Sequence, residues 1–297
     1  MNKVLVTGGA GFIGSNLVDR LVEMGMQVTI IDNLSTGKKE NINPAAYHWE
    51  KDLMDISIEQ LAMSLESFGI DTIFHLAAKT SVQESMLEPE LYNEMNVNVT
   101  LKLLEASRLL GIKKFIFSSS SSVYGDAEIP TTEKHSTELL SPYAATKLIG
   151  EEYCKLYGRI YGLDISILRY FNAYGNRMNN EGGYKSVLPI FKELKEKGLK
   201  LTINNDGNQR RDFVHTDDIC IMNIFAAMQN QGVNTYNVGT GISYSVNEIA
   251  DMFGGDRVYT NSVIEPFESL ADITKAYDEL KFKPKDKLKE WIKNYVN

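Results

Sequence analysis

Short apolar runs alternate with longer amphipathic stretches over the first 170 residues of the chain. This alternation is typical of strands and helices that follow one another in a parallel sheet covered on both faces. We predict strands at Lys3–Thr7, Gln27–Asp32, Ala46–Glu50, Thr72–Leu76, Lys114–Ser118 and Ile165–Tyr170. The predicted helices include Gly11–Met24, Glu90–Leu110 and Pro142–Tyr161. The pattern therefore indicates an α/β fold with a doubly wound parallel sheet.

The regular alternation stops after Asn172, where glycine, asparagine and other polar residues crowd positions 175–183. We interpret this stretch as a loop and the short mixed segments beyond it as a second, smaller mixed α/β domain. The predicted sheet domain covers residues 1–172, with a return segment near 214–240. The second domain covers 173–213 and 241–297. We expect it to lie over the carboxyl edge of the sheet, where open α/β sheets bind their ligands.

Composition narrows the possible partners. The 297-residue chain is 43% hydrophobic and 24% charged, as in ordinary globular proteins, and its net charge of -8 argues against nucleic acid as a partner. No run approaches the roughly 20 apolar residues of a membrane span. There is no signal-peptide pattern, no disulfide framework in Cys154 and Cys220, and no metal-ligand spacing among the histidines. We therefore expect a cytoplasmic protein without a metal, membrane or nucleic-acid partner.

A glycine-rich loop, Thr7–Gly14, follows the first predicted strand and opens the first helix. Gly8 suits the tight turn, Gly11 allows the backbone to approach a pyrophosphate, and Gly14 allows the helix to pack closely on the strand. The helix N-terminus adds free N–H groups and the positive end of a dipole. The loop in this context predicts a dinucleotide on a Rossmann domain.

The carboxylate of Asp32 ends the second strand, where a Rossmann domain hydrogen-bonds the adenosine ribose. Its negative charge would repel a 2′-phosphate, so the residue favours NAD over NADP. The alternative interpretation of Asp32 is an ordinary turn or N-cap residue.

Tyr143 and Lys147 are four residues apart and share one face of a predicted helix. A nearby cation favours the phenolate, so we expect Lys147 to lower the pKa of Tyr143. The phenolate could then take a proton from a carbinol while a hydride leaves for nicotinamide. The serine run Ser118–Ser122 ends a strand at the same edge of the sheet and could hydrogen-bond the reacting oxygen.

With these features the chain resembles the extended short-chain dehydrogenases/reductases, in the NAD-dependent epimerase/dehydratase group that acts on nucleotide sugars. The resemblance covers nearly the whole length. It is carried by Thr7–Gly14, Asp32–Gly37, His75–Ala78, Ser118–Gly125, Ser141–Lys147, Arg169–Asn172, Arg211–Phe213 and Tyr236–Gly239.

The resemblance implies roles for individual residues. Ser120, Tyr143 and Lys147 would be catalytic, with Lys147 also holding the nicotinamide ribose. The cofactor NAD would be bound by Gly8, Gly11, Phe12, Ile13, Gly14, Asp32, Asn33, Ser35, Thr36, Gly37, Asp52, Leu53, Leu76, Ala77, Ala78, Asn96, Ser118, Tyr143, Lys147 and Tyr170. The substrate would be bound by Ser81, Ser120, Ser122, Tyr143, Asn172, Arg211, Glu265 and Ser269.

The residues after Ser120 help to select the reaction. Dehydratases of the group carry an Asp-Glu pair there, and related decarboxylases tend to carry an acid, whereas this chain has Ser121 and Ser122. The resemblance therefore favours NAD-dependent 4-epimerisation of a UDP-sugar through a transient 4-keto intermediate. The alternatives are a nucleotide-4-keto-6-deoxysugar 4-ketoreductase and a dinucleotide sensor without catalysis.

Two positions near the end bear on the substrate. Where such epimerases usually carry an Arg-x-Gly-Asp clamp, an ungapped reading places residues 262–265 here, so the arginine is replaced by Ser262 and Glu265 could contact a ribose. The same reading places the small Ser269 at the gate of the sugar pocket. This favours N-acetylhexosamine substrates alongside UDP-glucose and UDP-galactose.

The resemblance also implies an assembly. In this family the helices that correspond to Glu90–Leu110 and Pro142–Tyr161 pair across a twofold axis. Both predicted helices carry apolar residues on more than one face, as such pairing requires, although simple burial would also explain this pattern. From the resemblance we expect a homodimer.

Overall fold

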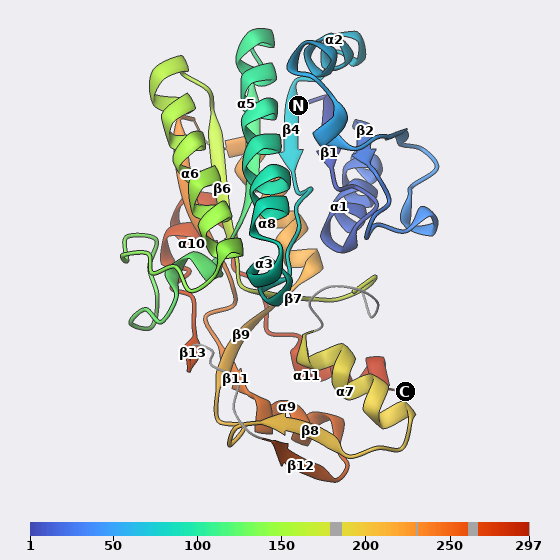
Figure 1. Ribbon diagram of the computed structural model, residues 1–297, viewed down its shortest axis with the longest axis vertical. Helices are drawn as coiled ribbons and strands as arrows, with labels where there is room; N and C mark the ends of the chain where they lie inside the picture. Colours follow the sequence, from blue (N-terminus) through green and yellow to red (C-terminus); the bar gives the residue numbers. More distant parts are fainter. Residues whose placement is uncertain (179–185, 230, 261–266, 297) are drawn as a thin grey trace.

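The computed structural model describes residues 1–178, 186–229, 231–260 and 267–296. Its main feature is a parallel sheet in the order β10-β6-β5-β4-β1-β2-β3 (Figure 1). The strands are β1 (Lys3–Thr7), β2 (Gln27–Asp32), β3 (Tyr47–Glu50), β4 (Thr72–His75), β5 (Lys114–Ser120), β6 (Ile165–Tyr170) and β10 (Val233–Val238). The strand order reverses beside β1, which is the hallmark of a doubly wound Rossmann sheet. The predicted fold class is confirmed.

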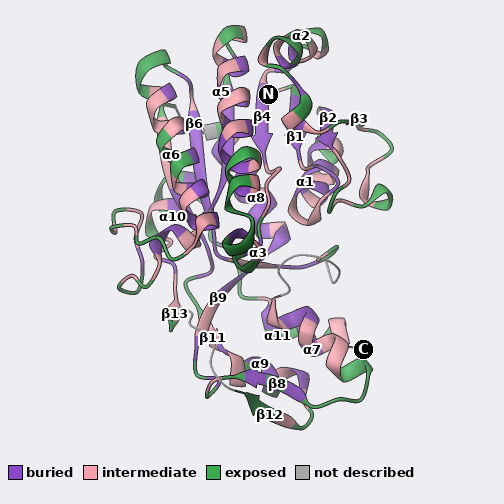
Figure 2. Ribbon diagram, viewed as in Figure 1, coloured by how far each residue is buried: buried purple, intermediate pink, exposed green. Residues whose placement is uncertain are grey.

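Helices cover both faces of this sheet, and its central strands β1, β4, β5 and β6 are buried along nearly their whole length (Figure 2). Two apolar clusters, one on each face, contain the core. One face is covered by α1 (Phe12–Glu23), α8 (Thr216–Gln229) and α10 (Thr274–Leu280), and the other by α2 (Ile58–Phe68), α5 (Val99–Leu110) and α6 (Pro142–Tyr161). Burial on both faces explains why the strands are continuous apolar runs rather than alternating ones.

The predicted strands are all present, and three have the predicted bounds. The strand predicted as Ala46–Glu50 begins one residue later, and the strand predicted as Thr72–Leu76 ends at His75. The strand predicted as Lys114–Ser118 continues to Ser120 because Ser119 and Ser120 still pair with β6. This extension carries the serine run to the carboxyl edge of the sheet.

The helix predicted at Glu90–Leu110 is present, and it contains a π-helical turn that was not predicted. The structure has α4 (Pro89–Asn93), a π-helical turn at Glu94–Asn98, and then α5. Asn96 lies in this turn and its side chain binds the backbone of Lys79, accepting from its N–H at 2.8 Å and donating to its carbonyl at 2.9 Å. A π turn re-aims a side chain at the cost of regular helix hydrogen bonds, and here it directs Asn96 to the 76–81 segment.

A second group of elements lies beyond the carboxyl edge and has its own apolar core (Figure 1). Its strands are β7 (Asn172–Tyr174), β8 (Leu201–Asn204), β9 (Arg210–His215), β11 (Ser243–Ser245), β12 (Arg257–Thr260) and β13 (Glu268–Ser269), and its helices are α7 (Val187–Glu196), α9 (Val246–Phe253) and α11 (Leu288–Val296). The chain returns to the main sheet through α8 and β10. The domain boundaries predicted above remain a proposal. Within the described ranges, no helix combines the length and apolarity that crossing a membrane requires.

Backbone approach between β1 and α1 leaves no room for a side chain at Gly14, where a Cβ atom would lie 2.1 Å from the carbonyl oxygen of Gly8. We expect Gly14→Ala to lower the free energy of unfolding by about 3 kcal/mol or more. Gly111→Ala is the matched control: Gly111 has a φ of +61° but nothing within 4 Å of a Cβ, so the loss should be about 1 to 2 kcal/mol. Urea unfolding measures both, and equal losses would contradict the steric argument.

Candidate active site

The glycine loop between β1 and α1 is shaped to bring backbone close to a ligand. Gly8 has a φ of +71°, and a Cβ there would lie 2.8 Å from the backbone nitrogen of Ala77. Gly11 is the N-cap of α1 and offers no side chain to cap the helix. The first amides of α1 therefore face the loop without a side-chain cap, which is the arrangement that binds a pyrophosphate at a helix N-terminus.

The carboxylate of Asp32 organises the loops beside this helix. One oxygen accepts from the N–H of Ala10 at 3.0 Å and the other from the N–H of Leu34 at 2.8 Å. Nearby, Asn33 donates to Asp52 at 2.7 Å, which brings together two residues predicted to contact the cofactor. Because an ionised carboxylate has about four acceptor positions, Asp32 can hold these loops and still accept ribose hydroxyls.

A buried chain of hydrogen bonds, which the sequence analysis missed, connects the end of β1 to the π turn. Thr7 bonds the Nδ1 atom of His75 at 2.8 Å, and His75 Nε2 bonds Thr100 at 2.9 Å. Thr100 donates to the carbonyl of Asn96 at 2.6 Å, so its oxygen accepts from His75 Nε2–H. Burial lowers the pKa of His75 to about 3, so the imidazole is neutral in this chain. The feature of the sequence that could have indicated this chain is His75, a histidine at the end of an apolar strand.

Strand β5 and helix α6 bring the predicted catalytic residues together. The Lys147 ammonium donates to the carbonyl of Ser118 at 2.8 Å, and the Ser120 side chain lies close enough to the Tyr143 phenol to lower its pKa. Helix α6 begins where it does because Ser141 caps it, accepting from the N–H of Ala144 at 3.1 Å. A buried phenol and a buried ammonium thus lie at the carboxyl edge of the sheet, each beside the serine run.

The expected effect of Lys147 on Tyr143 is not observed, and that prediction is wrong for this structure. Burial raises the pKa of Tyr143, and the nearby Ser120 side chain opposes this only in part. The Lys147 side chain reaches the carbonyl of Ser118 and the ring of Phe117 instead of the phenol. Burial also lowers the pKa of Lys147 to about 8. The shared helix face did not determine where the ammonium points.

Two of the predicted substrate residues that the structure describes carry a buried hydroxyl without a hydrogen-bond partner. Among the described residues, the side-chain oxygens of Ser122 and Ser269 are buried and make no hydrogen bond. Ser269 pairs in register with Arg211 across β13 and β9. A buried polar atom left unpaired costs about 1 to 3 kcal/mol, so these hydroxyls are suited to a polar ligand.

The remaining predicted substrate residues have these positions. Asn172 donates to the carbonyl of Asp212 at 3.0 Å, and Arg211 donates to the carbonyl of Arg210 at 2.8 Å. Ser81 caps the short helix α3 (Val82–Leu87). Glu265 lies outside the described residues, as do positions 262–264. The roles of all these residues stay predictions.

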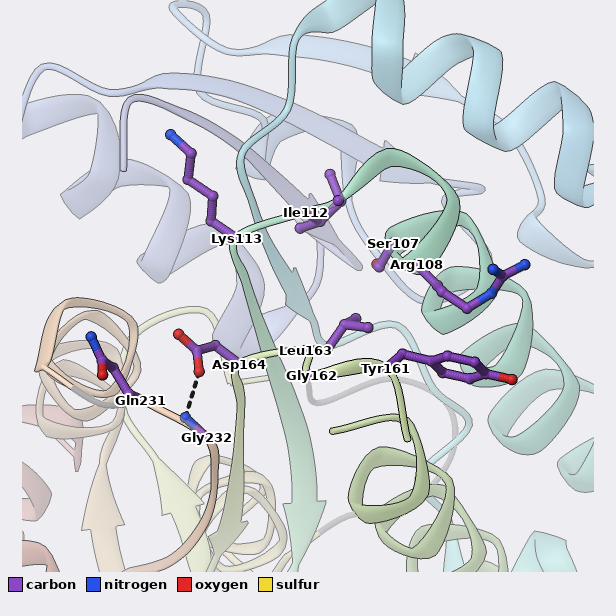
Figure 3. A pocket seen from close by; sticks show the side chains of 11 residues that line it. Ser107, Arg108, Ile112, Lys113, Tyr161, Gly162, Leu163, Asp164, Gln231 and Gly232 are labelled. Carbon is purple, nitrogen blue, oxygen red and sulfur yellow. Dashed lines mark hydrogen bonds between the residues drawn. The ribbon is translucent and has the colours of Figure 1, made fainter. Parts of the chain in front are cut away.

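A hollow at the opposite edge of the main sheet is distinct from this site (Figure 3). It lies where α5 and α6 end and where β5, β6 and β10 begin, and Arg108, Tyr161 and Asp164 are among the residues that line it. It therefore lies at the amino ends of the strands, a strand length away from the serine run at the carboxyl end of β5. Ligands of open α/β sheets bind at the carboxyl ends.

Comparisons with known proteins agree with this geometry. The sequence model of the NAD dependent epimerase/dehydratase family matches residues 4–239. A putative UDP-glucose 4-epimerase of Methanocaldococcus jannaschii is 40% identical, over 99% of this chain and 97% of its own. The crystal structure of Thermotoga maritima UDP-glucose 4-epimerase with UDP-glucose has a TM-score of 0.94 at 37% identity, over 99% of this chain and 97% of that one. A UDP-N-acetylglucosamine 4-epimerase of Methanobrevibacter ruminantium, in complex with UDP-N-acetylmuramic acid, has a TM-score of 0.92 at 39% identity over the same shares.

The buried phenol provides a direct test of the site. Tyr143→Phe removes one oxygen and should lower kcat about 100-fold to 10,000-fold, because a positioned acid-base group contributes this much. Dinucleotide affinity, measured by fluorescence titration, should change little. Tyr47→Phe is the matched control on the exposed edge strand, where the side chain is 55% exposed. Full activity in Tyr143→Phe would exclude the phenol as the reacting group.

Proposed function

The chain belongs to the NAD-dependent epimerase/dehydratase family and is an NAD-dependent epimerase, and we propose that it inverts C4 of a UDP-sugar. The observation that carries the proposal is the joint placement of Ser120, Tyr143 and Lys147 at the carboxyl edge of the sheet. The similarity to UDP-sugar 4-epimerases over nearly the whole chain supports it.

The glycine loop fits NAD, since Gly11 caps α1 without a side chain and leaves the first amides of the helix to face a pyrophosphate. Gly8, Gly11 and Asp32 would hold the cofactor, and its positively charged nicotinamide ring, when bound, supplies a hydride acceptor that later returns the hydride. Tyr143 would take the proton of the C4 hydroxyl, and Ser120 would hydrogen-bond the same oxygen. The sugar would then turn over as its 4-keto form and regain hydride and proton with C4 inverted.

The electrostatics of the site bear on this mechanism. Burial raises the pKa of the Tyr143 phenol, so the phenolate is costly in the chain by itself. The Ser120 side chain lowers that pKa, and so would a positive charge close to the phenol. A positive charge placed beside Tyr143 would therefore favour proton abstraction at this site.

The residues after Ser120 favour epimerisation over dehydration. Ser121 and Ser122 begin a short 3-10 turn at residues 121–124, at the position where dehydratases of the group carry an acid and a base. A serine hydroxyl at its ordinary pKa does neither task. We therefore propose that the sugar returns from the site without loss of water.

We further propose that hexoses with an N-acetyl group at C2 are accepted. Ser269 is small, and its buried hydroxyl has no partner among the described residues, which leaves a polar group for the substituent. The likeness to a UDP-N-acetylglucosamine 4-epimerase supports this range. Glucose, N-acetylglucosamine and their C4 epimers are the proposed substrates.

Incubation of the purified protein with UDP-galactose and UDP-N-acetylgalactosamine, without added cofactor, tests the proposal. We expect the glucose epimers to form, because the cofactor is regenerated in each turnover, and chromatography of the sugar nucleotides measures them. Oxidation of NADH by a 4-keto-6-deoxysugar nucleotide, with no epimer formed, would instead identify a ketoreductase. If Tyr143→Phe kept the cellular function of the protein, a sensor would be the better interpretation.

We also propose a homodimer built on α5 and α6. Ile149 and Ile160 on α6 and Leu109 on α5 are 39%, 57% and 53% exposed, which is unusual for large apolar side chains on two adjacent helices. A shallow hollow on the same helix is lined by Leu148, Ile149, Glu152, Tyr153, Lys155, Leu156 and Arg159.

Light scattering should therefore give twice the chain mass. Ile149→Arg should give the single-chain mass, because a charge in an apolar interface is costly to desolvate. Met63→Arg is the control on α2, where the side chain is 70% exposed and we expect no change. A wild-type protein that scatters as a single chain at micromolar concentration would refute the dimer.

A further inference from the structure

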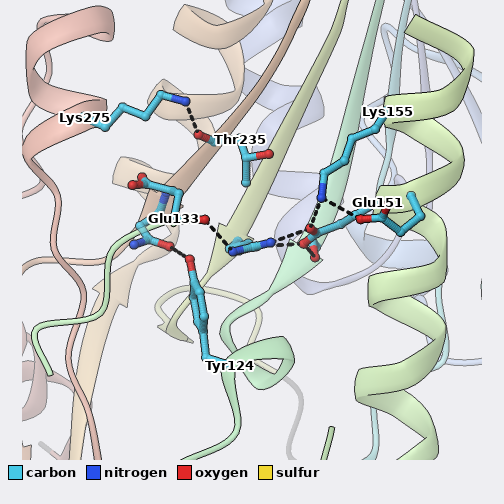
Figure 4. Close-up of polar contacts among 10 residues, drawn as sticks. Tyr124, Glu133, Glu151, Lys155, Thr235 and Lys275 are labelled. Carbon is cyan, nitrogen blue, oxygen red and sulfur yellow. Dashed lines mark hydrogen bonds and ion pairs between the residues drawn. The ribbon is translucent and has the colours of Figure 1, made fainter. Parts of the chain in front are cut away.

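Helix α6 carries a third buried polar group on the same face, and the proposed mechanism does not use it. Glu151 lies one helical turn after Lys147 and is 0% exposed. Its carboxylate accepts from the Ser119 hydroxyl at 2.6 Å and from the Arg169 guanidinium at 2.8 Å and 2.6 Å. Lys155 approaches one of its oxygens to 3.8 Å (Figure 4). A carboxylate this deeply buried is rare unless it is paired, as it is here.

These contacts form a register between helix and strand. Three consecutive serines of β5 each approach α6: the carbonyl of Ser118 accepts from Lys147, the Ser119 hydroxyl donates to Glu151, and the Ser120 side chain lies close to the Tyr143 phenol. The Glu151 contact lies between the two catalytic ones along the strand. A shift of α6 along β5 would therefore break the Ser119 bond together with the contacts of Lys147 and Tyr143.

Arg169 extends the register to the next strand. It precedes Tyr170 on β6. Its guanidinium lies 4.6 Å from the centre of the ring of Tyr124, a residue that follows the serine run in the chain. Tyr124 in turn donates to Asn237 of β10 at 2.6 Å. Glu151 is thus bonded to β5 and β6 at once, so the catalytic helix is fixed against both strands through one side chain.

The charge of Glu151 also acts on Lys147. Burial holds the pKa of the Lys147 ammonium down at about 8, and Glu151 counters this by raising it. Near pH 8, three further titratable groups around Lys147 are uncharged. His75 on β4 has a pKa of about 3, and burial raises the pKa of Tyr170 on β6 and the pKa of Cys154 on α6. Arg169 keeps its proton and offsets the cost of burying the carboxylate.

We propose that Glu151 is a positioning residue for the epimerase reaction: held by Ser119 and Arg169, its carboxylate sets the register of Lys147 and Tyr143 against β5. The inference rests on the proposed function, since it assigns Glu151 to the service of those two residues. A purely structural ion pair would be replaceable by neutral side chains of similar volume without effect on the protonation of Lys147.

Glu151→Gln in the NAD-loaded protein tests the proposal. The amide keeps an acceptor for Ser119 but removes the charge, so Lys147 should lose its proton about one pH unit lower. As pH rises, both kcat and the affinity for NADH, measured by fluorescence, should therefore fall at a lower pH than in the wild type. Glu152→Gln, the same change at a neighbouring side chain that is 64% exposed, should leave both pH profiles unchanged.

Two further variants keep the test decisive. Ser119→Ala should lower kcat with no shift of either pH profile, because it removes a positioning contact and leaves the charge. If Glu151→Gln fails to fold, Glu151→Gln with Arg169→Met removes both charges together, and its profiles should likewise fall at a lower pH than those of the wild type. A profile that coincides with that of the wild type in the folded variant would overturn the proposal.

The failure of the proposed function would look different. A wild-type protein that bound NADH but epimerised no UDP-sugar would refute the function, whereas the pH dependence of NADH binding would still report on Glu151 and Lys147. A wild type that epimerises UDP-sugars beside a Glu151→Gln variant with unshifted profiles would refute only the role of Glu151.

Discussion

Parallel pairing in the main sheet is the constraint on which the site depends. Strand β1 pairs with β2 and β4, and β5 pairs with β4 and β6, all in one direction. The carboxyl ends of these strands therefore meet at one edge, which brings the glycine loop, Asp32 and the serine run together from distant parts of the sequence. Because a shift of one residue would turn each strand's side chains to the other face, the register that buries the core also aligns the chemistry.

Burial in the site disfavours the charged forms of its own proposed catalytic residues. Burial raises the pKa of Tyr143 and lowers that of Lys147, so it favours the neutral phenol and the neutral amine, the opposite of what proton abstraction beside a cation needs. The chain counters this locally, with the Ser120 side chain acting on one group and the Glu151 carboxylate on the other. Such perturbed groups gathered at one edge of a sheet are typical of active sites, where protonation is set by few neighbours.

Local patterns predicted much of this molecule, and tertiary contacts explain what they missed. Helix α6 has the predicted bounds because Ser141 caps its start and Gly162, with a φ of +70°, ends it. The helix predicted at Glu90–Leu110 contains an unpredicted π-helical turn, in which Asn96 bonds the backbone of Lys79, 17 residues earlier in the chain. The pKa of Tyr143 was mispredicted for the same reason: spacing in a helix gives a shared face, whereas the carbonyl that captures Lys147 lies on another element.

The same distinction explains why the reaction class was easier to infer than the sugar. The proposed catalytic groups lie on β5 and α6, long elements whose apolar pattern and caps are visible in the sequence. The proposed substrate groups lie on short strands, such as β13 at Glu268–Ser269. These strands are anchored by Asp212, which accepts from Thr240 at 2.7 Å and from the backbone of Ala271 at 3.2 Å. A single buried carboxylate can hold such segments with little demand on the side chains beside it, so the sequence around Ser269 carries no periodic pattern from which a substrate contact could be predicted.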